Sequence, residues 1–536
     1  MVARGGSVPP DRFQGERRDE MRTIDHPFSV PKLRTEIDGF DLIANGGLPK
    51  ARSTLISGTS GSSKTVFAVQ FLAAGIMRAN EPGVFVTFEE SPEDIRANMR
   101  GFGWDIASWE AMGKWAFVDA SPSPDLPFHI AGRYDLGALI ARIEHAVGKV
   151  EARRVSVDSL GGIFTQLGEN AEIRHELHRL ALALRRMGAT SIITAERLEE
   201  HGPVSRYGVE EFVSDNVVLF RNVLEDEVRR RTVEILKFRG ATHQKGEWPF
   251  TIVPNEGIVV IPLSALELEQ KSSDTRITSG NVELDKMCGG GFFRDSVILV
   301  SGPTGTGKTL ITTEYLAAGS RLGERSLLFA FEESREQLFR NAFGWGVDFA
   351  QLEAEGVLRV VCEYPESAAL EDHLIRIKKE TIAFNPARVA VDSLSALERV
   401  ASIKSYREFV IGLTSFIKHR EVPGLYTATT SSLLGGTSIT ETHISTITDS
   451  IILLRYVEDI GRVHRSAAVL KMRGSTHDKD IREFVIDHQG LHILAPFRTI
   501  FGILSGNTRQ VSPSDLGPLS TDPEGPRTRL ISQRTN

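Results

Sequence analysis

Cysteine and long apolar runs are what this sequence lacks. Its 536 residues include two cysteines, Cys288 and Cys362, which excludes a disulfide framework and favours a reducing compartment. No stretch of about 18 apolar residues could span a bilayer, and residues 1–20 lack the apolar segment of a secretory signal. We therefore expect a cytoplasmic protein with no membrane partner.

An excess of positive charge is also missing. Lys and Arg number 63 against 70 Asp and Glu, a formal net charge of −7, which disfavours a generally cationic nucleic-acid-binding surface but leaves a local basic patch open. The content of 41% hydrophobic and 25% charged residues is typical of a globular chain. At this length two to four domains are expected. Residues 1–20 and 511–536 are predicted to be disordered tails.

One pattern occurs twice in the chain. GTSGSSKT, around Lys64, returns as GPTGTGKT around Lys308, 244 positions later. FEES returns after 243 positions, and VDSL and the KFRGATH/KMRGSTH pair return after 234. Matching blocks in the same order, at slowly drifting offsets, indicate a tandem duplication. We place the first domain at residues 21–262 and the second at residues 263–510, separated by a polar stretch.

Each copy alternates apolar segments with helical ones. An apolar run leads into a glycine-rich loop and a helix, a second run ends in Phe-Glu-Glu, and a third ends in Asp-Ser. This alternation predicts an α/β fold, with a mainly parallel sheet flanked by helices in each domain.

The two glycine-rich loops match a phosphate-binding pattern. Glycines allow successive backbone N–H groups to turn toward the phosphates, the lysine pairs with the β- and γ-phosphates, and the threonine hydroxyl binds Mg²⁺. We therefore expect ATP and Mg²⁺ as ligands. The expected contacts are Gly58, Thr59, Ser60, Gly61, Ser62, Ser63, Lys64 and Thr65 in the first loop and Thr304, Gly305, Thr306, Gly307, Lys308, Thr309 and Leu310 in the second.

The first loop departs from the pattern at Ser63, where the second has Gly307. If this position requires a positive φ, the serine side chain costs about 1 kcal/mol. The rest of the fold can hold such a loop in place. ATP binding is therefore expected in the first domain too, and Ser63 is the main indication of a weaker site.

Acidic residues follow two of the apolar runs in each copy. Glu89-Glu90 and Glu332-Glu333 can orient or deprotonate an attacking oxygen, or they can stabilise the start of the next helix. Their recurrence behind two phosphate loops favours the catalytic interpretation. The aspartates that end the third run, where a simple turn is the alternative, are expected to hold Mg²⁺ directly or through water: Asp158 and Asp392.

A basic motif, Lys-x-Arg-Gly-x-x-His, also recurs. Scattered basic residues usually form a solvated face, but a fixed spacing favours contact with phosphate, for which arginine is well suited. A head-to-tail ring could supply this motif to a neighbour's site. The motif comprises Lys237, Arg239 and His243 in the first copy and Lys471, Arg473 and His477 in the second. By contrast, we interpret the tryptophans of the two Phe-Gly-Trp segments, Trp104 and Trp345, as core rather than base-stacking residues.

Together these motifs resemble the KaiC family, double-domain ATPases and autokinases that include the cyanobacterial circadian clock protein. The resemblance covers about residues 25–510. It rests on GTSGSSKT, FEES, ARRVSVDSL, RYGVEEFVSDNVV and KFRG in the first half, and on CGGGFF, GPTGTGKT, ARVAVDSLSAL, THISTITDSIILL and KMRGSTHDK in the second. It implies RecA-like domains in a homohexameric double ring with ATP and Mg²⁺ at subunit interfaces. The first ring would hydrolyse ATP slowly, and the second would act as a serine/threonine protein kinase on itself.

Carried over by position, the phosphosites are Ser445 and Thr446, with Thr440 as a further site. The offset of 234 lands on Glu211 and Phe212, so the hydroxyl pair is confined to the second copy. Arg399 resembles the family's arginine near the phosphosite. The resemblance adds Glu332 to Thr65 and Thr309 as metal ligands, and it adds these ATP contacts: Phe238, Trp345, Arg465, Met472, Ser475, Thr476 and Lys479.

The resemblance also bears on partners. HGPVSRYGVEEFVSDNV is similar to the family and implies a KaiB-like partner on the first domain, whereas the C-terminal tail is unlike the one that engages KaiA, which argues against KaiA dependence. A circadian clock and a stress or signalling timer both stay open. The rival functions are a DNA-dependent ATPase of the recombinase or helicase type and an ATP-dependent scaffold with little turnover. The net charge and the lack of a basic-aromatic stretch disfavour a nucleic-acid partner.

Overall fold

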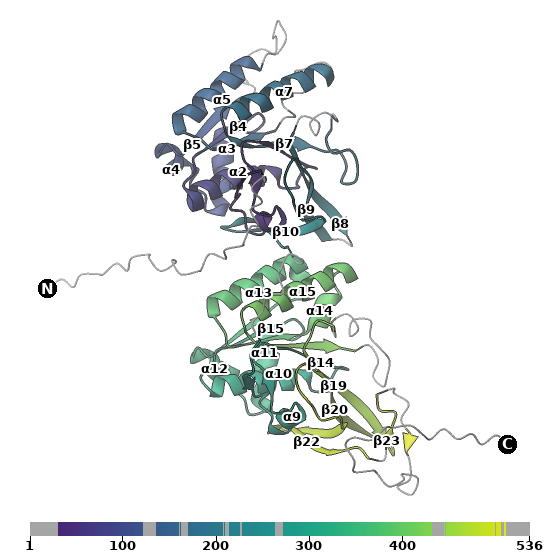
Figure 1. Ribbon diagram of the computed structural model, residues 1–536. Coiled ribbons are helices and arrows are strands. Elements are labelled where there is room, and N and C mark those ends of the chain that lie inside the picture. The colour runs from purple at the N-terminus through teal and green to yellow at the C-terminus, as the bar shows by residue number, and fades with distance from the viewer. Residues whose placement is uncertain are drawn as a thin grey trace, which may run out of the picture. The chain divides into compact units, whose positions relative to one another are not determined.

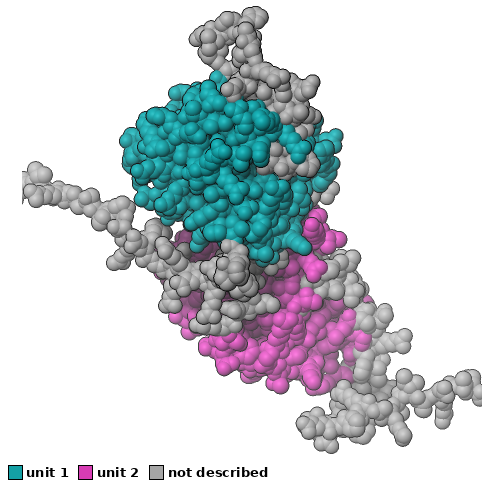
Figure 2. All heavy atoms as spheres, turned by 45° about the horizontal axis from the view of Figure 1, so that its top comes forward, with its two compact units in different colours: residues 1–265 teal, residues 266–536 magenta. Residues whose placement is uncertain are grey.

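The structure, a computed structural model, describes residues 30–121, 136–159, 161, 170–206, 208, 214–225, 228–262, 272–430, 444, 446–498, 500–504 and 509–510. The chain divides into two compact units, residues 1–265 and residues 266–536 (Figure 2). Each unit contains its own large sheet and its own hydrophobic clusters. None of the helices in the described part of the chain is long and apolar enough to cross a membrane.

The sheet of the first unit has nine strands in the order β11-β10-β9-β8-β3-β7-β6-β4-β5. Neighbouring strands are parallel from β5 to β8 and antiparallel from β8 to β11. The strands are β3 (Ser53–Gly58), β4 (Gly83–Thr87), β5 (Trp115–Asp119), β6 (Arg154–Asp158), β7 (Thr190–Glu196), β8 (Asn216–Glu225), β9 (Val228–Phe238), β10 (Glu247–Val253) and β11 (Gly257–Val260).

The second unit repeats this sheet strand for strand, in the order β16-β15-β17-β18-β14-β19-β20-β21-β22. The strands are β14 (Val297–Gly302), β15 (Ser326–Ala330), β16 (Leu358–Cys362), β17 (Arg388–Asp392), β18 (Gly424–Thr429), β19 (Ser450–Asp459), β20 (Arg462–Met472), β21 (Arg482–Asp487) and β22 (Gly490–Pro496). Two mainly parallel sheets of the same topology confirm the predicted α/β duplication. Short two-stranded pairs accompany them: β1 (Lys32–Leu33) with β2 (Leu48–Pro49), β12 (Arg276–Ile277) with β13 (Phe292–Phe293), and β23 (Ile500–Phe501) with β24 (Arg509–Gln510).

Helices lie on both faces of each sheet (Figure 1). In β4, Phe85 packs into one hydrophobic cluster while Val84 and Val86 pack into another, as expected for a parallel sheet buried on both sides. The first unit has α1 (Phe40–Ile43), α2 (Lys64–Ala74), η1 (Gly75–Ala79), α3 (Pro92–Met99), η2 (Arg100–Phe102), α4 (Ile106–Ala111), α5 (Gly137–Val150) and α7 (Asn170–Arg186). The second has α9 (Val282–Met287), α10 (Lys308–Arg321), α11 (Arg335–Gly344), α12 (Phe349–Ala354), η3 (Pro365–Ser367), α13 (Leu370–Phe384), α14 (Leu394–Glu398) and α15 (Ile403–His419).

Local capping fixes where the helices behind the acidic pairs begin. Ser91 caps α3 by accepting a hydrogen bond from the backbone N–H of Asp94, and Pro92 occupies the first turn. Ser334 and Gln337 form a reciprocal capping box at the start of α11. Each glutamate pair is therefore held between a strand end and a capped helix, at the same edge of the sheet as the phosphate loop.

Candidate active site

The first glycine-rich loop connects β3 to α2. Gly61 and Ser63 both have left-handed backbone conformations, with φ of 76° and 74°. Ser63 thus takes the positive φ whose cost the sequence suggested. The Lys64 side chain folds back over the loop, where its Nζ donates a hydrogen bond to the Thr59 carbonyl oxygen at 2.8 Å.

The second loop, between β14 and α10, has the same geometry. Gly305 and Gly307 have φ of 79° and 107°. Lys308 Nζ donates to the carbonyl oxygens of Gly302 at 2.9 Å and Pro303 at 3.0 Å. In both loops, burial lowers the pKa of the lysine, while nearby carboxylates act in the opposite direction. Each loop therefore holds an ammonium group over a turn of backbone, which is a suitable cradle for phosphate.

Asp158, at the carboxyl end of β6, connects this strand to the first loop. Its carboxylate accepts hydrogen bonds from the hydroxyls of Thr65, the second residue of α2, and of Thr194 in β7. Burial raises the pKa of Asp158, because an ionised carboxyl loses hydration there. The two hydroxyls and the ammonium of Lys64 oppose this effect.

Asp392, at the end of β17, repeats the arrangement in the second unit. It accepts hydrogen bonds from the hydroxyls of Thr309 and Thr427, and burial raises its pKa as well. A loop hydroxyl beside a carboxylate suits Mg²⁺, which usually keeps water and phosphate oxygens as its other ligands. No cluster of three or more His, Cys, Asp or Glu that could hold a metal occurs among the described residues. The donors present thus fit a Mg²⁺ ion that binds together with a nucleotide.

The two glutamates of the first unit have different hydrogen-bond partners. Glu89 Oε1 accepts a hydrogen bond from Ser159 Oγ at 2.5 Å, and Glu89 also acts electrostatically on Lys64. Glu90 Oε2 accepts one from Asn98 Nδ2 in α3 at 3.1 Å. Glu89 is therefore the member of the pair that faces the phosphate loop.

The second pair differs in the partner of its first member. Glu332 Oε1 lies 4.0 Å from Nη2 of Arg399, whereas Glu333 Oε2 accepts a hydrogen bond from Asn341 Nδ2 at 2.9 Å. Burial and the nearby Asp392 carboxylate raise the pKa of Glu333. An arginine, rather than a serine, thus accompanies the leading glutamate in the second site.

The basic motifs lie at the other end of their sheets. Phe238 pairs with Asn216, which pairs with Thr54 near the start of β3, whereas the phosphate loop leaves the opposite end of that strand at Gly58. Lys237 Nζ donates to the Ser214 carbonyl oxygen at 3.0 Å. The structure does not bring this motif to the phosphate loop of its own chain.

The second motif has the same position. Lys471 Nζ donates to the Thr448 carbonyl oxygen at 2.6 Å, and Arg473 Nη2 donates to that of Thr446 at 2.8 Å. Thr446 is exposed, and the other two expected phosphosites, Ser445 and Thr440, lie outside the described residues. The motif therefore holds the backbone at Thr446, the one expected phosphosite that the structure describes.

The remaining expected ATP contacts have varied surroundings. Phe238, Leu310 and Met472 are buried in the hydrophobic clusters, which leaves only their backbone for a ligand. Arg465 lies near the second loop, 5.9 Å from the ring of Tyr456. Four more expected contacts lie in or near the second basic motif: Ser475, Thr476, His477 and Lys479. The hydroxyl of Ser475 accepts a hydrogen bond from Arg276. His243 contacts the ring of Phe238.

The two Phe-Gly-Trp segments do not occupy equivalent positions in the two units. Asp105 and Asp348 cap α4 and α12, an offset of 243, so Trp345 is equivalent to Phe102 rather than to Trp104. Trp104 is 2% exposed and packs in the core, as expected, and Trp345 packs partly buried against its own core.

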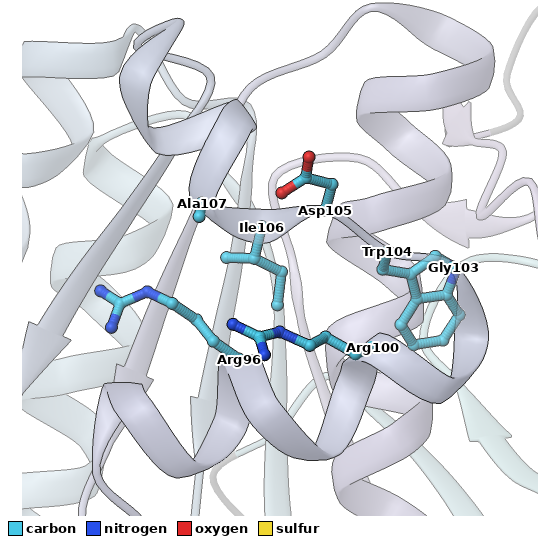
Figure 3. A pocket seen from close by; sticks show the side chains of 7 residues that line it. All are labelled: Arg96, Arg100, Gly103, Trp104, Asp105, Ile106 and Ala107. Carbon is cyan, nitrogen blue, oxygen red and sulfur yellow. The ribbon is translucent and has the colours of Figure 1, made fainter.

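Trp104 also lines a cavity of about 300 Å³ between α3 and α4 (Figure 3). Arg96 and Arg100 lie along this cavity, and Arg96 Nε donates a hydrogen bond to the Glu110 carboxylate at 2.7 Å. No residue of the phosphate loop is among those that line the cavity.

Sequence reasoning missed four residues of these sites. Thr194 and Thr427 bind the strand-end aspartates. Glu196, the last residue of β7, and Glu200, which follows that strand, act electrostatically on Lys64. A comparison of the two copies could have identified the threonines, because Thr-Ala recurs before the end of both strands. No motif marks the two glutamates.

Two phosphate loops, each with a strand-end aspartate bound to the loop threonine and a glutamate pair just after a neighbouring strand, define a tandem P-loop ATPase. The family model of the KaiC ATPase matches residues 33–265 and 277–497. The chain belongs to the KaiC family, and its two domains are ATP-binding ATPase domains.

The chain is similar to relatives over most of its length. It is 66% identical over 492 residues to the circadian clock protein KaiC3 of Synechocystis sp. (strain ATCC 27184 / PCC 6803 / Kazusa), which covers 92% of this chain and 97% of that protein. It is 57% identical over 483 residues to the circadian clock oscillator protein KaiC of Thermostichus vulcanus, covering 90% and 93%. It is 54% identical over 492 residues to that of Synechococcus elongatus, covering 92% and 94%.

Proposed function

We propose that the protein hydrolyses ATP slowly in its first domain and phosphorylates itself on serine and threonine in its second. Together these activities would act as a circadian clock or a related signalling timer. The main support is the asymmetry of two otherwise matched halves, since only the second carries a Ser-Thr pair at the segment held by the basic motif. The names of the relatives favour the clock role.

In the second domain, the loop N–H groups and Lys308 hold the phosphates of ATP, which supplies the phosphoryl group. Thr309 and Asp392 would hold Mg²⁺, with the Glu332 carboxylate as a further ligand, and the ion would neutralise charge on the phosphates. Glu332 also takes the proton from the attacking hydroxyl, and Glu333, fixed by Asn341, assists it.

In the first domain, Lys64, Thr65 and Asp158 have the corresponding roles. Glu89, with Glu90 beside it, orients the attacking water instead of a hydroxyl. The hydrogen bond from Ser159 keeps the Glu89 carboxylate directed toward the strand end. The same framework thus supports hydrolysis in one domain and transfer in the other.

The position of the basic motifs supports a homohexamer. Because Lys237 and Lys471 lie at the opposite end of the sheet from their own phosphate loops, each site needs these cations from a neighbouring subunit. A closed ring satisfies every site. A KaiB-like partner on the first domain completes the proposal.

Incubation with γ-labelled ATP, followed by phosphosite mapping by mass spectrometry, tests the kinase activity. We expect label on Ser445 and Thr446, with a minor amount on Thr440. Hydrolysis without any covalent label would contradict the autokinase and leave the ATPase intact.

A further inference from the structure

An acidic segment of the first unit, residues 196–206, is attached to the strand that carries the phosphate loop. Ser57, the residue before the end of β3, donates a hydrogen bond from its hydroxyl to the Val204 carbonyl oxygen. Arg197 is buried and donates from Nε to the Pro203 carbonyl oxygen at 2.9 Å. These contacts fix the segment beside the site.

Glu200 in this segment binds the phosphate loop directly. Its Oε1 accepts a hydrogen bond from the Thr59 hydroxyl, and its Oε2 accepts one from the Asn222 backbone N–H at 3.1 Å. Asn222 in turn donates from Nδ2 to the Gly61 carbonyl oxygen at 3.4 Å. One carboxylate is thus connected to both arms of the loop.

Glu196 adds a second negative charge. It ends β7 directly beside Gly58, where the loop begins, and its side chain pairs with Arg206 at 3.7 Å. Lys64 interacts electrostatically with the carboxylates of Glu196 and Glu200, besides those of Asp158 and Glu89. The loop lysine is therefore surrounded by negative charge before any phosphate arrives.

Among the residues that the structure describes, no carboxylate accepts a hydrogen bond from residues 303–307 of the second phosphate loop. Pro303 replaces Thr59 and offers no hydroxyl, and Thr429 stands at the strand position of Glu196. Instead of a carboxylate, the Tyr456 hydroxyl holds this loop, by a hydrogen bond to the Thr304 carbonyl oxygen at 3.2 Å. In the sequence, the first acidic residue after Thr429 is Glu441.

We propose that Glu200 and Glu196 form an acidic latch that lowers the nucleotide affinity of the first domain and is displaced when phosphate binds. A bound triphosphate brings several negative charges to the loop whose Thr59 hydroxyl Glu200 binds, and like charges at such distances repel. Thr59 and Lys64 become available only when the carboxylates withdraw. The segment extends to Arg206, so its displacement on nucleotide binding also moves residues 202–206. This inference rests on the assignment of GTSGSSKT as the first nucleotide site.

The test measures the dissociation constant of a non-hydrolysable fluorescent ATP analogue on the full chain. The measurement is made in a Lys308→Ala background, which removes nucleotide binding at the second loop, so that the measured affinity is that of the first. Glu200→Gln removes the charge and keeps one of the two acceptor oxygens, and Glu199→Gln is the matched control on the neighbouring exposed residue. We expect Glu200→Gln to lower the dissociation constant roughly 3- to 10-fold, less at high salt, and Glu199→Gln to leave it unchanged.

A second variant, Glu196→Thr, introduces the residue of the second domain and should act in the same direction. Amide hydrogen exchange at residues 202–206 should also increase when nucleotide is added to the parent protein. An unchanged dissociation constant in both Glu200→Gln and Glu196→Thr would overturn the latch. If Lys64→Ala in the same background left binding intact, the site assignment itself would fail.

Discussion

Ser63 occupies in the first phosphate loop the left-handed backbone position that Gly307 occupies in the second. Both residues directly precede the helix that begins at the loop lysine. A side chain at positive φ costs about 1 kcal/mol that glycine avoids. The first loop therefore keeps its shape at the expense of stability.

Replacing this serine should stabilise the first domain. We expect Ser63→Gly to raise its free energy of unfolding by about 1 kcal/mol, measured by denaturant titration. Gly307→Ser is the reciprocal control and should destabilise the second domain, since an added Cβ would lie 2.9 Å from Ile486 Cδ1. If Ser63→Gly lowered the free energy of unfolding, the idea that Ser63 strains the first loop would be contradicted.

Assembly should depend on nucleotide. Because the cations of the basic motifs lie far from their own phosphate loops, ATP and Mg²⁺ should join neighbouring subunits into a hexamer. Light scattering with and without ATP–Mg²⁺ measures this, and Arg473→Ala should weaken assembly. A monomer in both conditions would rule out the ring.

The glutamates should separate the two activities. Glu332→Gln removes the proposed base, so phosphorylation should fall by about 10²- to 10⁴-fold while ATP binding is retained. Glu89→Gln, the equivalent change in the first domain, should instead slow hydrolysis and spare phosphorylation. Unimpaired phosphorylation in a Glu332→Gln, Glu333→Gln protein would refute this assignment.

The phosphosites should be dispensable for hydrolysis. Ser445→Ala, Thr446→Ala should lose nearly all incorporated phosphate and keep ATPase activity, because the first domain is untouched. Each phosphate adds about −1.5 to −2 charge, and we expect a coupling to the first domain of about 1–3 kcal/mol.

Two outcomes distinguish a wrong assignment of the phosphosites from a missing coupling between the two domains. Label at the wild-type level in Ser445→Ala, Thr446→Ala would show that the sites are wrong. Identical ATPase rates in phosphorylated wild type, this variant and a double Glu mimic would keep the sites and remove the coupling.

The duplication and the parallel sheets could be predicted because their signals repeat. Asp158 and Asp392 end apolar runs in both copies, and strand ends of a parallel sheet share one edge. The repeated letters Phe-Gly-Trp, by contrast, suggest an alignment of the two copies that the helix caps Asp105 and Asp348 do not support. Glu200 could not be predicted, since its contact with Thr59 depends on the path of a loop that no periodicity describes.

Lys471 and Arg473 donate hydrogen bonds to the carbonyl oxygens of Thr448 and of Thr446, an expected phosphosite. These hydrogen bonds have a consequence for the coupling between subunits. A phosphate on Thr446 would compete for Arg473 with the next subunit's nucleotide, since one guanidinium cannot fully neutralise both. In a head-to-tail ring each subunit offers this arginine to one neighbour only. The effect of a phosphorylation would then pass from subunit to subunit in one direction around the ring, and such an assembly would be polar.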